Sequence, residues 1–114
     1  MNEPKFTKGE WLLPHFVTAK DETDCTCRFV LNEKYCGCIA TIEYGEIDNP
    51  PLEEAKANAF LTCAAPDMFH ALKSFVDNVD EWLKTGEPAN PETSKAIYDE
   101  AKMALMKALG EANQ

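Results

Sequence analysis

The stretch EEAKANAFLTCAAPDMFHALKSFVDNVDEWLK, residues 53–84, decides the fold because it is the longest run with helical periodicity. Pro66 interrupts it, since proline removes one backbone hydrogen bond and disfavours the helical conformation of the residue before it. The sequence therefore predicts a central helix over residues 50–84 that is either kinked or divided into two helices near Pro66.

Both predicted helices carry start signals. Asn49 is a candidate cap for the central helix, with Pro50 in a position where the missing N–H costs nothing. Asn90 before Pro91 predicts the start of a last helix over residues 91–109.

Apolar residues follow Pro66 at helical spacing, and we interpret them as one stripe that faces the core. The stripe consists of Met68 or Phe69, Leu72, Phe75 or Val76, Val79, and Trp82 or Leu83.

The first half of the chain predicts strands. One strand is predicted over residues 10–18, and Pro14 confines it to a sheet edge or a bulge. Two more strands are predicted over residues 25–31 and 35–44. Together they form a β-meander over residues 10–44.

This order of elements predicts an α+β fold. A three-stranded antiparallel sheet from the N-terminal half would pack on two or three C-terminal helices, because the apolar face of a sheet needs a cover. A chain of 114 residues is expected to form a single domain over residues 1–114.

The composition is acidic, with 20 Asp and Glu against 11 Lys and Arg and a net charge of −9. Nucleic-acid binding by counterion release requires the opposite sign, so direct nucleic-acid binding is not expected. No apolar run approaches the ~20 residues that span a bilayer, and no signal peptide is apparent, so we expect no membrane contact and a cytoplasmic location with reduced cysteines.

The acidic residues allow two interpretations. They can form an ordinary solvated surface, or Asp77, Asp80 and Glu81 on the central helix can form a patch that imitates nucleic acid and occupies a basic groove on a host enzyme. Both interpretations stay open at the level of the sequence.

Four cysteines, Cys25, Cys27, Cys36 and Cys38, lie in two strands at a spacing of two. If the strands pair, the four sulfurs could approach one another and bind zinc, although residues two apart on a flat strand lie ~7 Å from each other, and a bulge at Gly37 would be required. The alternative is that these cysteines are small apolar core residues. No other cofactor is expected.

No nucleophile with a neighbouring base and no glycine-rich phosphate loop is recognisable, so the sequence predicts a protein that is not an enzyme. Trp11 and Trp82 are core residues or rim a pocket in which a planar ligand stacks, and Arg28, the sole arginine, is the candidate phosphate contact. Met103 and Met106 fall partly off the apolar stripe of the last helix and could mark a homo-oligomer contact.

One family resemblance covers nearly the whole chain. The segment EEAKANAFLTCAAPDMFHALK resembles the E-A-x-A-N-A-x-L-I-A-A-A-P-x-L-L-x-A-L segment of small proteins encoded by tailed phages and prophages. TKGEW, residues 7–11, is similar to their T-P-G-P-W opening, GCIA, residues 37–40, to the end of their hairpin, and residues 101–110 to their closing A-x-x-A-L-x-K-A-x-G. The four clustered cysteines depart from that pattern.

The resemblance implies a phage setting but supplies no catalytic residues, because the group is mostly of unknown function. We therefore predict a non-catalytic phage or prophage accessory protein that inhibits or sequesters a host component. That component is either a host protein that meets the acidic surface or a small nucleotide signal. The alternative is a structural or interaction module stapled by zinc through the four clustered cysteines.

Overall fold

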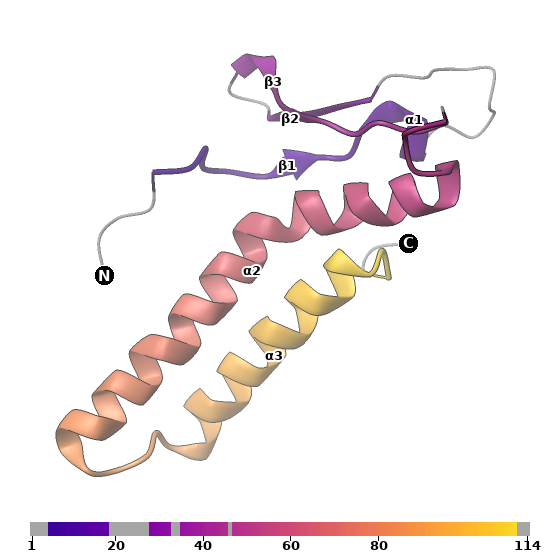
Figure 1. Ribbon diagram of the computed structural model, residues 1–114. Coiled ribbons are helices and arrows are strands. Elements are labelled where there is room, and N and C mark those ends of the chain that lie inside the picture. The colour runs from indigo at the N-terminus through magenta and orange to yellow at the C-terminus, as the bar shows by residue number, and fades with distance from the viewer. Residues whose placement is uncertain (1–4, 19–27, 33–34, 46, 112–114) are drawn as a thin grey trace.

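The computed structural model describes residues 5–18, 28–32, 35–45 and 47–111, apart from the side chains of residues 35–37. Its elements are β1 (Trp11–Leu12), α1 (His15–Thr18), β2 (Phe29–Asn32), β3 (Tyr35–Thr41), α2 (Leu52–Thr85) and α3 (Pro91–Ala108). A three-stranded antiparallel sheet lies in the N-terminal half and the long helices lie in the C-terminal half (Figure 1), which confirms the α+β prediction.

The sheet has the order β1-β2-β3. Trp11 pairs with Asn32, and Val30 pairs with Ala40, with an irregular register between Val30 and Asn32. The buried Asn32 amide donates hydrogen bonds to the carbonyl oxygens of Lys8 (3.2 Å) and Glu10 (2.9 Å). These bonds hold the segment that precedes β1 beside the sheet.

The prediction of one strand over residues 10–18 is wrong. β1 contains only two residues, and a single helical turn, α1, follows it. Pro14 has no N–H for the sheet, and its carbonyl oxygen instead accepts a hydrogen bond from Val17 N–H at 3.0 Å. The turn directs Phe16 into the core, where its ring lies 4.7 Å from the Tyr44 ring. Tertiary packing therefore prevails over the strand propensity of this segment.

The other two strands differ from their predicted limits. β2 begins at Phe29 and ends at Asn32, while residues 25–27 lie outside the described part of the chain. β3 ends at Thr41 rather than at residue 44.

The main core lies between the sheet and the first half of α2. Phe16, Val30 and Ile42 pack against Ala55 and Ala59, and the buried Cys63 closes the cluster. The small side chains on α2 allow the sheet to approach the helix closely, since alanine places little volume between the two backbones.

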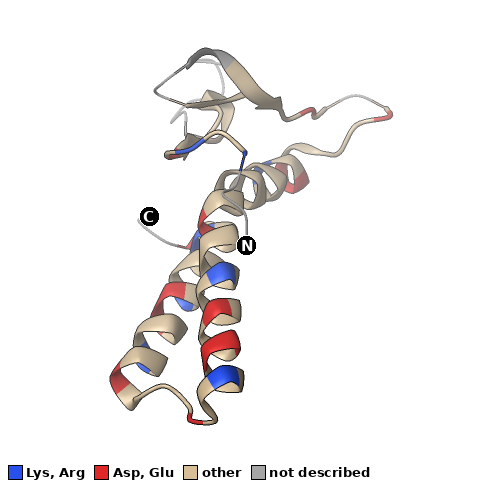
Figure 2. Cartoon of the chain, turned by 90° about the vertical axis from the view of Figure 1, so that its left-hand side faces the viewer, with Lys and Arg blue, Asp and Glu red and all other residues tan. Residues whose placement is uncertain are grey.

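α2 is one continuous helix of 34 residues that contains Pro66 and bends along its length (Figures 1 and 2). The missing N–H of the proline accounts for a bend at that point. The prediction that Asn49 caps this helix is wrong, because Pro51 occupies the N-cap position and makes no side-chain hydrogen bond. Gly86, with φ 76°, ends the helix in the left-handed conformation.

α3 folds back against the second half of α2, and we call the two helices the helical hairpin. Its start agrees with the sequence, because the Asn90 side-chain oxygen accepts a hydrogen bond from Thr93 N–H at 2.8 Å. The molecule measures 57 × 26 × 26 Å and has a radius of gyration of 17.4 Å, whereas a compact chain of this length would have about 13 Å. The helical hairpin therefore projects beyond the sheet.

The prediction that the whole stripe after Pro66 faces the core is wrong for its outer members. Leu72, Phe75 and Leu83 expose 65%, 56% and 76% of their surface. The sheet covers only the first half of α2, and α3 covers only one edge of the second half. A single neighbouring helix is too narrow to bury an apolar stripe of this width.

Candidate functional site

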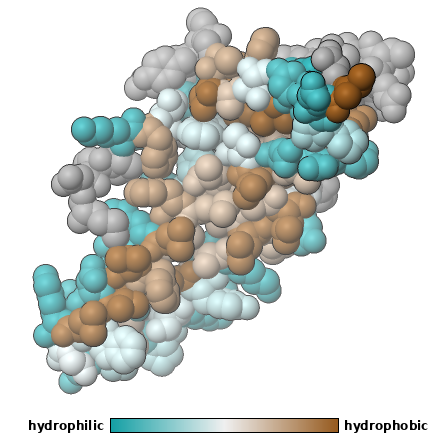
Figure 3. Space-filling view, viewed as in Figure 1, coloured by the Kyte–Doolittle hydropathy of each residue, from teal (hydrophilic) through white to brown (hydrophobic). Residues whose placement is uncertain are grey.

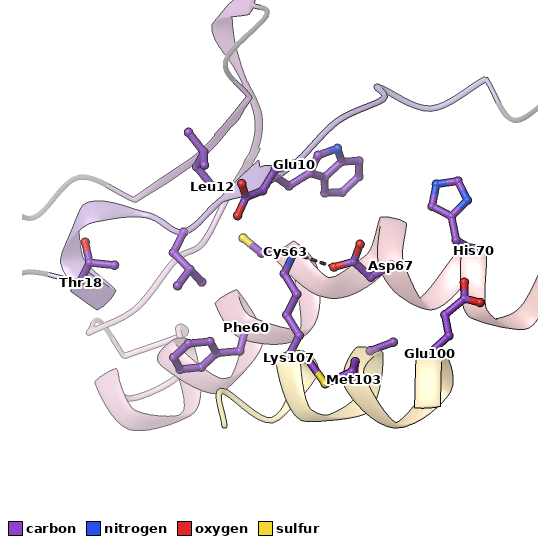
Figure 4. Close-up of a pocket in the computed structure, with 13 residues that line it drawn as sticks. Glu10, Leu12, Thr18, Phe60, Cys63, Asp67, His70, Glu100, Met103 and Lys107 are labelled. Carbon is purple, nitrogen blue, oxygen red and sulfur yellow. Dashed lines mark hydrogen bonds and ion pairs between the residues drawn. The ribbon is translucent and has the colours of Figure 1, made fainter. Parts of the chain in front are cut away.

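A cavity of about 620 Å³ lies where β1, α2 and α3 meet (Figure 4). Its volume falls within the range of roughly 300–1,000 Å³ that is typical of small-molecule sites. The residues that line it come from three segments far apart in the sequence: Glu10, Trp11, Leu12, Leu13, Thr18, Phe60, Cys63, Asp67, His70, Glu100, Met103, Ala104 and Lys107.

Carboxylates outnumber cations on the cavity wall. Lys107 on α3 forms an ion pair with Asp67 on α2 at 2.6 Å, and both side chains are partly exposed. Glu10 and Glu100 add two more carboxylates. The ammonium of Lys107 is thus already engaged, and the wall is negative at neutral pH.

The polar groups converge on one point. Figure 4 shows the Glu10 carboxylate, the Cys63 thiol and the Lys107 ammonium directed toward the same region of the cavity, between the end of the sheet and the two helices. A ligand at this point could donate hydrogen bonds to Glu10 and Asp67 at the same time.

Cys63 is a poor nucleophile in this position. Burial raises the pKa of its thiol from 9.0 to about 11, while the nearby Lys107 ammonium lowers the pKa and the Glu10 carboxylate raises it. The thiol therefore stays protonated at neutral pH, and the thiolate is the form that attacks electrophiles and binds metals. Cys63 is therefore not placed to act as a covalent nucleophile.

Aromatic rings stand at one end of the cavity. The Trp11 indole N–H donates to the Thr7 carbonyl oxygen at 2.9 Å, which fixes the orientation of the ring. Phe6 contacts Trp11 edge to face at 6.3 Å and Phe69 at 5.1 Å, and its ring lies 6.1 Å from that of His70. Trp11 therefore lines the cavity with a ring whose orientation is held by its neighbours.

The structure does not bring the three proposed stacking and phosphate contacts together. Trp11 lines the cavity, whereas Trp82 lies near the end of α2 that is remote from the sheet (Figure 1). Arg28 forms an ion pair with Glu43 at 3.1 Å and lies over the Tyr44 ring at 4.2 Å. Its guanidinium is absent from the lining of the cavity.

Asp77, Asp80 and Glu81 lie in the second half of α2 and are exposed. Asp77 pairs with Lys73 at 2.7 Å, and helical spacing places Lys84 beside Asp80. Lysines thus flank the three acidic residues on this part of the helix (Figure 2), so the negative charge forms a short patch and not the continuous array of a nucleic-acid backbone.

The proposed zinc ligands fall mostly outside the described residues. This is so for Cys25 and Cys27, and for the side chain of Cys36, while Cys38 is exposed rather than in the core. Within the described ranges, no group of three or more His, Cys, Asp or Glu residues could hold a metal ion. Zinc binding through the four cysteines stays a prediction.

The charged residues of the cavity were not among the site residues that the sequence indicated. Asp67 and Lys107 are 40 positions apart, so no local motif connects them, and Glu100 reads as an ordinary surface residue of α3. Met103 also lines the cavity, although its position on the helix suggested an oligomer contact. Only Trp11 could be selected from the sequence.

Across the described part of the chain, no helix combines the length and the apolar character needed to cross a membrane. The family model described as Salmonella phage P22 protein Y8K6 matches residues 1–112. No match was found among curated proteins or among solved structures.

Proposed function

The chain belongs to the family of Salmonella phage P22 protein Y8K6, and from this premise we propose that it is a non-catalytic phage accessory protein that sequesters a small host molecule. The observation that supports the proposal is the cavity of about 620 Å³ between the sheet and the helical hairpin. Sequestration would take place in the cytoplasm of the host cell, where such a ligand is available.

The residues that line the cavity indicate which class of small molecule it could bind. Trp11 offers a planar surface, and Glu10, Asp67 and Glu100 offer acceptors. A planar ligand with amino groups fits this combination, because it can stack on the indole and donate to the carboxylates. A nucleoside is the ligand class with these features.

A free phosphate group fits the cavity less well. Among the described residues, Lys107 is the sole lysine or arginine on the wall, and it is already paired with Asp67. A phosphate would therefore meet three carboxylates with one committed cation to balance them. We accordingly expect a nucleoside to bind more tightly than the corresponding nucleotide.

Tryptophan fluorescence tests this proposal. A Trp82→Phe variant leaves Trp11 as the single tryptophan, so a change in emission reports on the cavity. Adenosine, cytidine and guanosine, titrated to about 1 mM, should include at least one ligand that quenches Trp11 and raises the melting temperature. Its 5′-monophosphate should bind at least tenfold more weakly.

Two further variants locate the site. Glu10→Gln should weaken nucleoside binding, since an amide accepts hydrogen bonds less strongly than a carboxylate. Glu81→Gln removes the same charge from α2 outside the cavity lining and should leave binding unchanged. Absence of binding by all three nucleosides, or equal effects of the two variants, would refute the proposal.

A further inference from the structure

The helical hairpin has one side on which exposed apolar residues gather. Helical spacing places them in a row along each helix, and Figure 3 shows apolar side chains along both helices on the side turned toward the viewer. We call this set the apolar face: Leu61, Leu72, Phe75, Val76 and Leu83 on α2, with Tyr98 and Leu105 on α3 and Leu109 directly after it.

A groove of about 490 Å³ runs along the apolar face between the two helices. Ala71 and Ala101 lie in it next to the larger side chains of Phe75, Tyr98 and Leu105. Small residues beside large ones produce ridges and hollows of the kind that interlock when helices pack.

The size of the apolar face matches that of a protein interface. Its eight residues expose between 38% and 76% of their surfaces. With roughly 150–200 Å² for a large side chain, this amounts to on the order of 800 Å² of apolar surface. A standard stable interface covers about 800 Å² on each partner, whereas monomers rarely leave so large an apolar patch in water.

The charge distribution favours a neutral, apolar partner. Among the described residues, none of those that line the groove is charged. Lys102 is exposed one turn after Tyr98 and brings a single cation to the margin of the apolar face. On the outer surfaces of the two helices, Lys73 pairs with Asp77 at 2.7 Å and Lys95 pairs with Asp99 at 2.8 Å. These pairs neutralise the flanks, so two copies can approach despite the net charge of −9.

We propose that a second copy of this chain covers the apolar face, so that two helical hairpins form a four-helix bundle. A two-fold axis through the face brings the same row of residues onto itself, as in most homodimers. Each chain supplies one antiparallel helix pair, which is half of such a bundle. The bundle also explains why α2 and α3 extend beyond the sheet, since the partner supplies the missing cover.

The cavity where β1, α2 and α3 meet, which we call the junction cavity, remains available in this dimer. Phe60, Glu100 and Met103 line the cavity, whereas Leu72, Tyr98 and Leu105 line the groove, and the two sets lie on different sides of the helical hairpin. Dimer formation and ligand binding are therefore separable, and failure of one does not imply failure of the other.

The test measures the mass of the full chain by sedimentation and by light scattering between about 1 and 200 µM. The wild type should show twice the chain mass of 12.7 kDa, with dissociation toward the lowest concentrations. Leu105→Glu and Phe75→Glu each place a charge in the apolar face and should weaken the dimer at least 100-fold. Ala96→Glu adds the same charge on the opposite side of α3 and should leave the dimer intact.

Circular dichroism checks that each variant keeps its helices. If a glutamate variant loses its helices, Leu105→Ala is used in its place, and the affinity of the dimer should then fall about tenfold. The proposal is overturned by a wild type that is monomeric throughout, by glutamate variants with intact helices that dimerise as the wild type does, or by an alanine variant that dissociates no more readily. It is also overturned if the additional mass belongs to a different protein.

Discussion

Gly110 is the position at which a single methyl group should report most directly on the packing of the helical hairpin. It follows α3 with φ 77°, and a Cβ there would lie 2.8 Å from two carbon atoms of the Phe60 ring. Phe60 belongs to α2 and lines the junction cavity. The substitution Gly110→Ala therefore tests the contact that holds the end of α3 against α2.

The expected cost has two parts. Alanine in the left-handed region costs about 1 kcal/mol, partly offset by the reduced freedom of the unfolded chain. The overlap with Phe60 adds about 1–3 kcal/mol, because the ring or the end of α3 must shift within packed surroundings.

Gly86→Ala provides the matched control. Gly86 has nearly the same φ, 76°, but a Cβ there would meet nothing within 4 Å. Both variants share the conformational cost, so the difference between them isolates the overlap with Phe60. Thermal unfolding should place Gly110→Ala roughly 4–12 °C below Gly86→Ala.

A double-mutant cycle with Phe60→Leu completes the test. The smaller side chain should remove most of the additional cost of Gly110→Ala, which would appear as a coupling energy of about 1 kcal/mol or more. Equal destabilisation by the two alanine variants would refute the reasoning, as would the absence of coupling to Phe60.

Two further predictions concern stability. The pKa of Cys63 is about 11 in the fold against 9.0 for an exposed thiol. The buried neutral thiol therefore contributes about 2–3 kcal/mol to the free energy of unfolding, and this contribution is fully present below pH 9 and is lost as the pH rises through 11. Urea unfolding at pH 8 and pH 10.5 should show this additional decline in the wild type and not in Cys63→Ser, and identical declines would contradict it. Asn90→Ala should lower the stability by about 1 kcal/mol in thermal unfolding, because the hydrogen bond from Thr93 N–H is lost. Asn90→Asp should retain the cap. An alanine variant as stable as the wild type would count against the cap.

Where local chemistry decides the conformation, the sequence was sufficient. Periodicity located both long helices, and Asn90 before Pro91 marked the start of α3 because a side-chain oxygen can accept the hydrogen bond that the first turn lacks. Pro14 indicated an edge or bulged strand over residues 10–18, and this prediction was wrong, because β1 ends at Leu12 and the burial of Phe16 favours a helical turn after Pro14. The α+β class follows from the order of these elements.

The candidate site depends on contacts between distant segments. Trp11 could be selected as an aromatic residue, but its approach to Asp67 and Lys107 requires β1 to lie across the junction of α2 and α3. No periodic pattern specifies the pairing of a carboxylate with an ammonium 40 residues away. The pKa of Cys63 likewise depends on burial by neighbours that the local sequence does not reveal.

The sequence by itself determined which residues of α2 form an apolar stripe, because the spacing of side chains around a helix is fixed by its geometry. Only the tertiary structure decided how much of that stripe is covered. The sheet reaches as far as Cys63, α3 covers one edge beyond it, and Leu72 and Leu83 remain in water. Burial depends on the width and reach of neighbouring elements, and these are properties of the assembled fold rather than of any one segment.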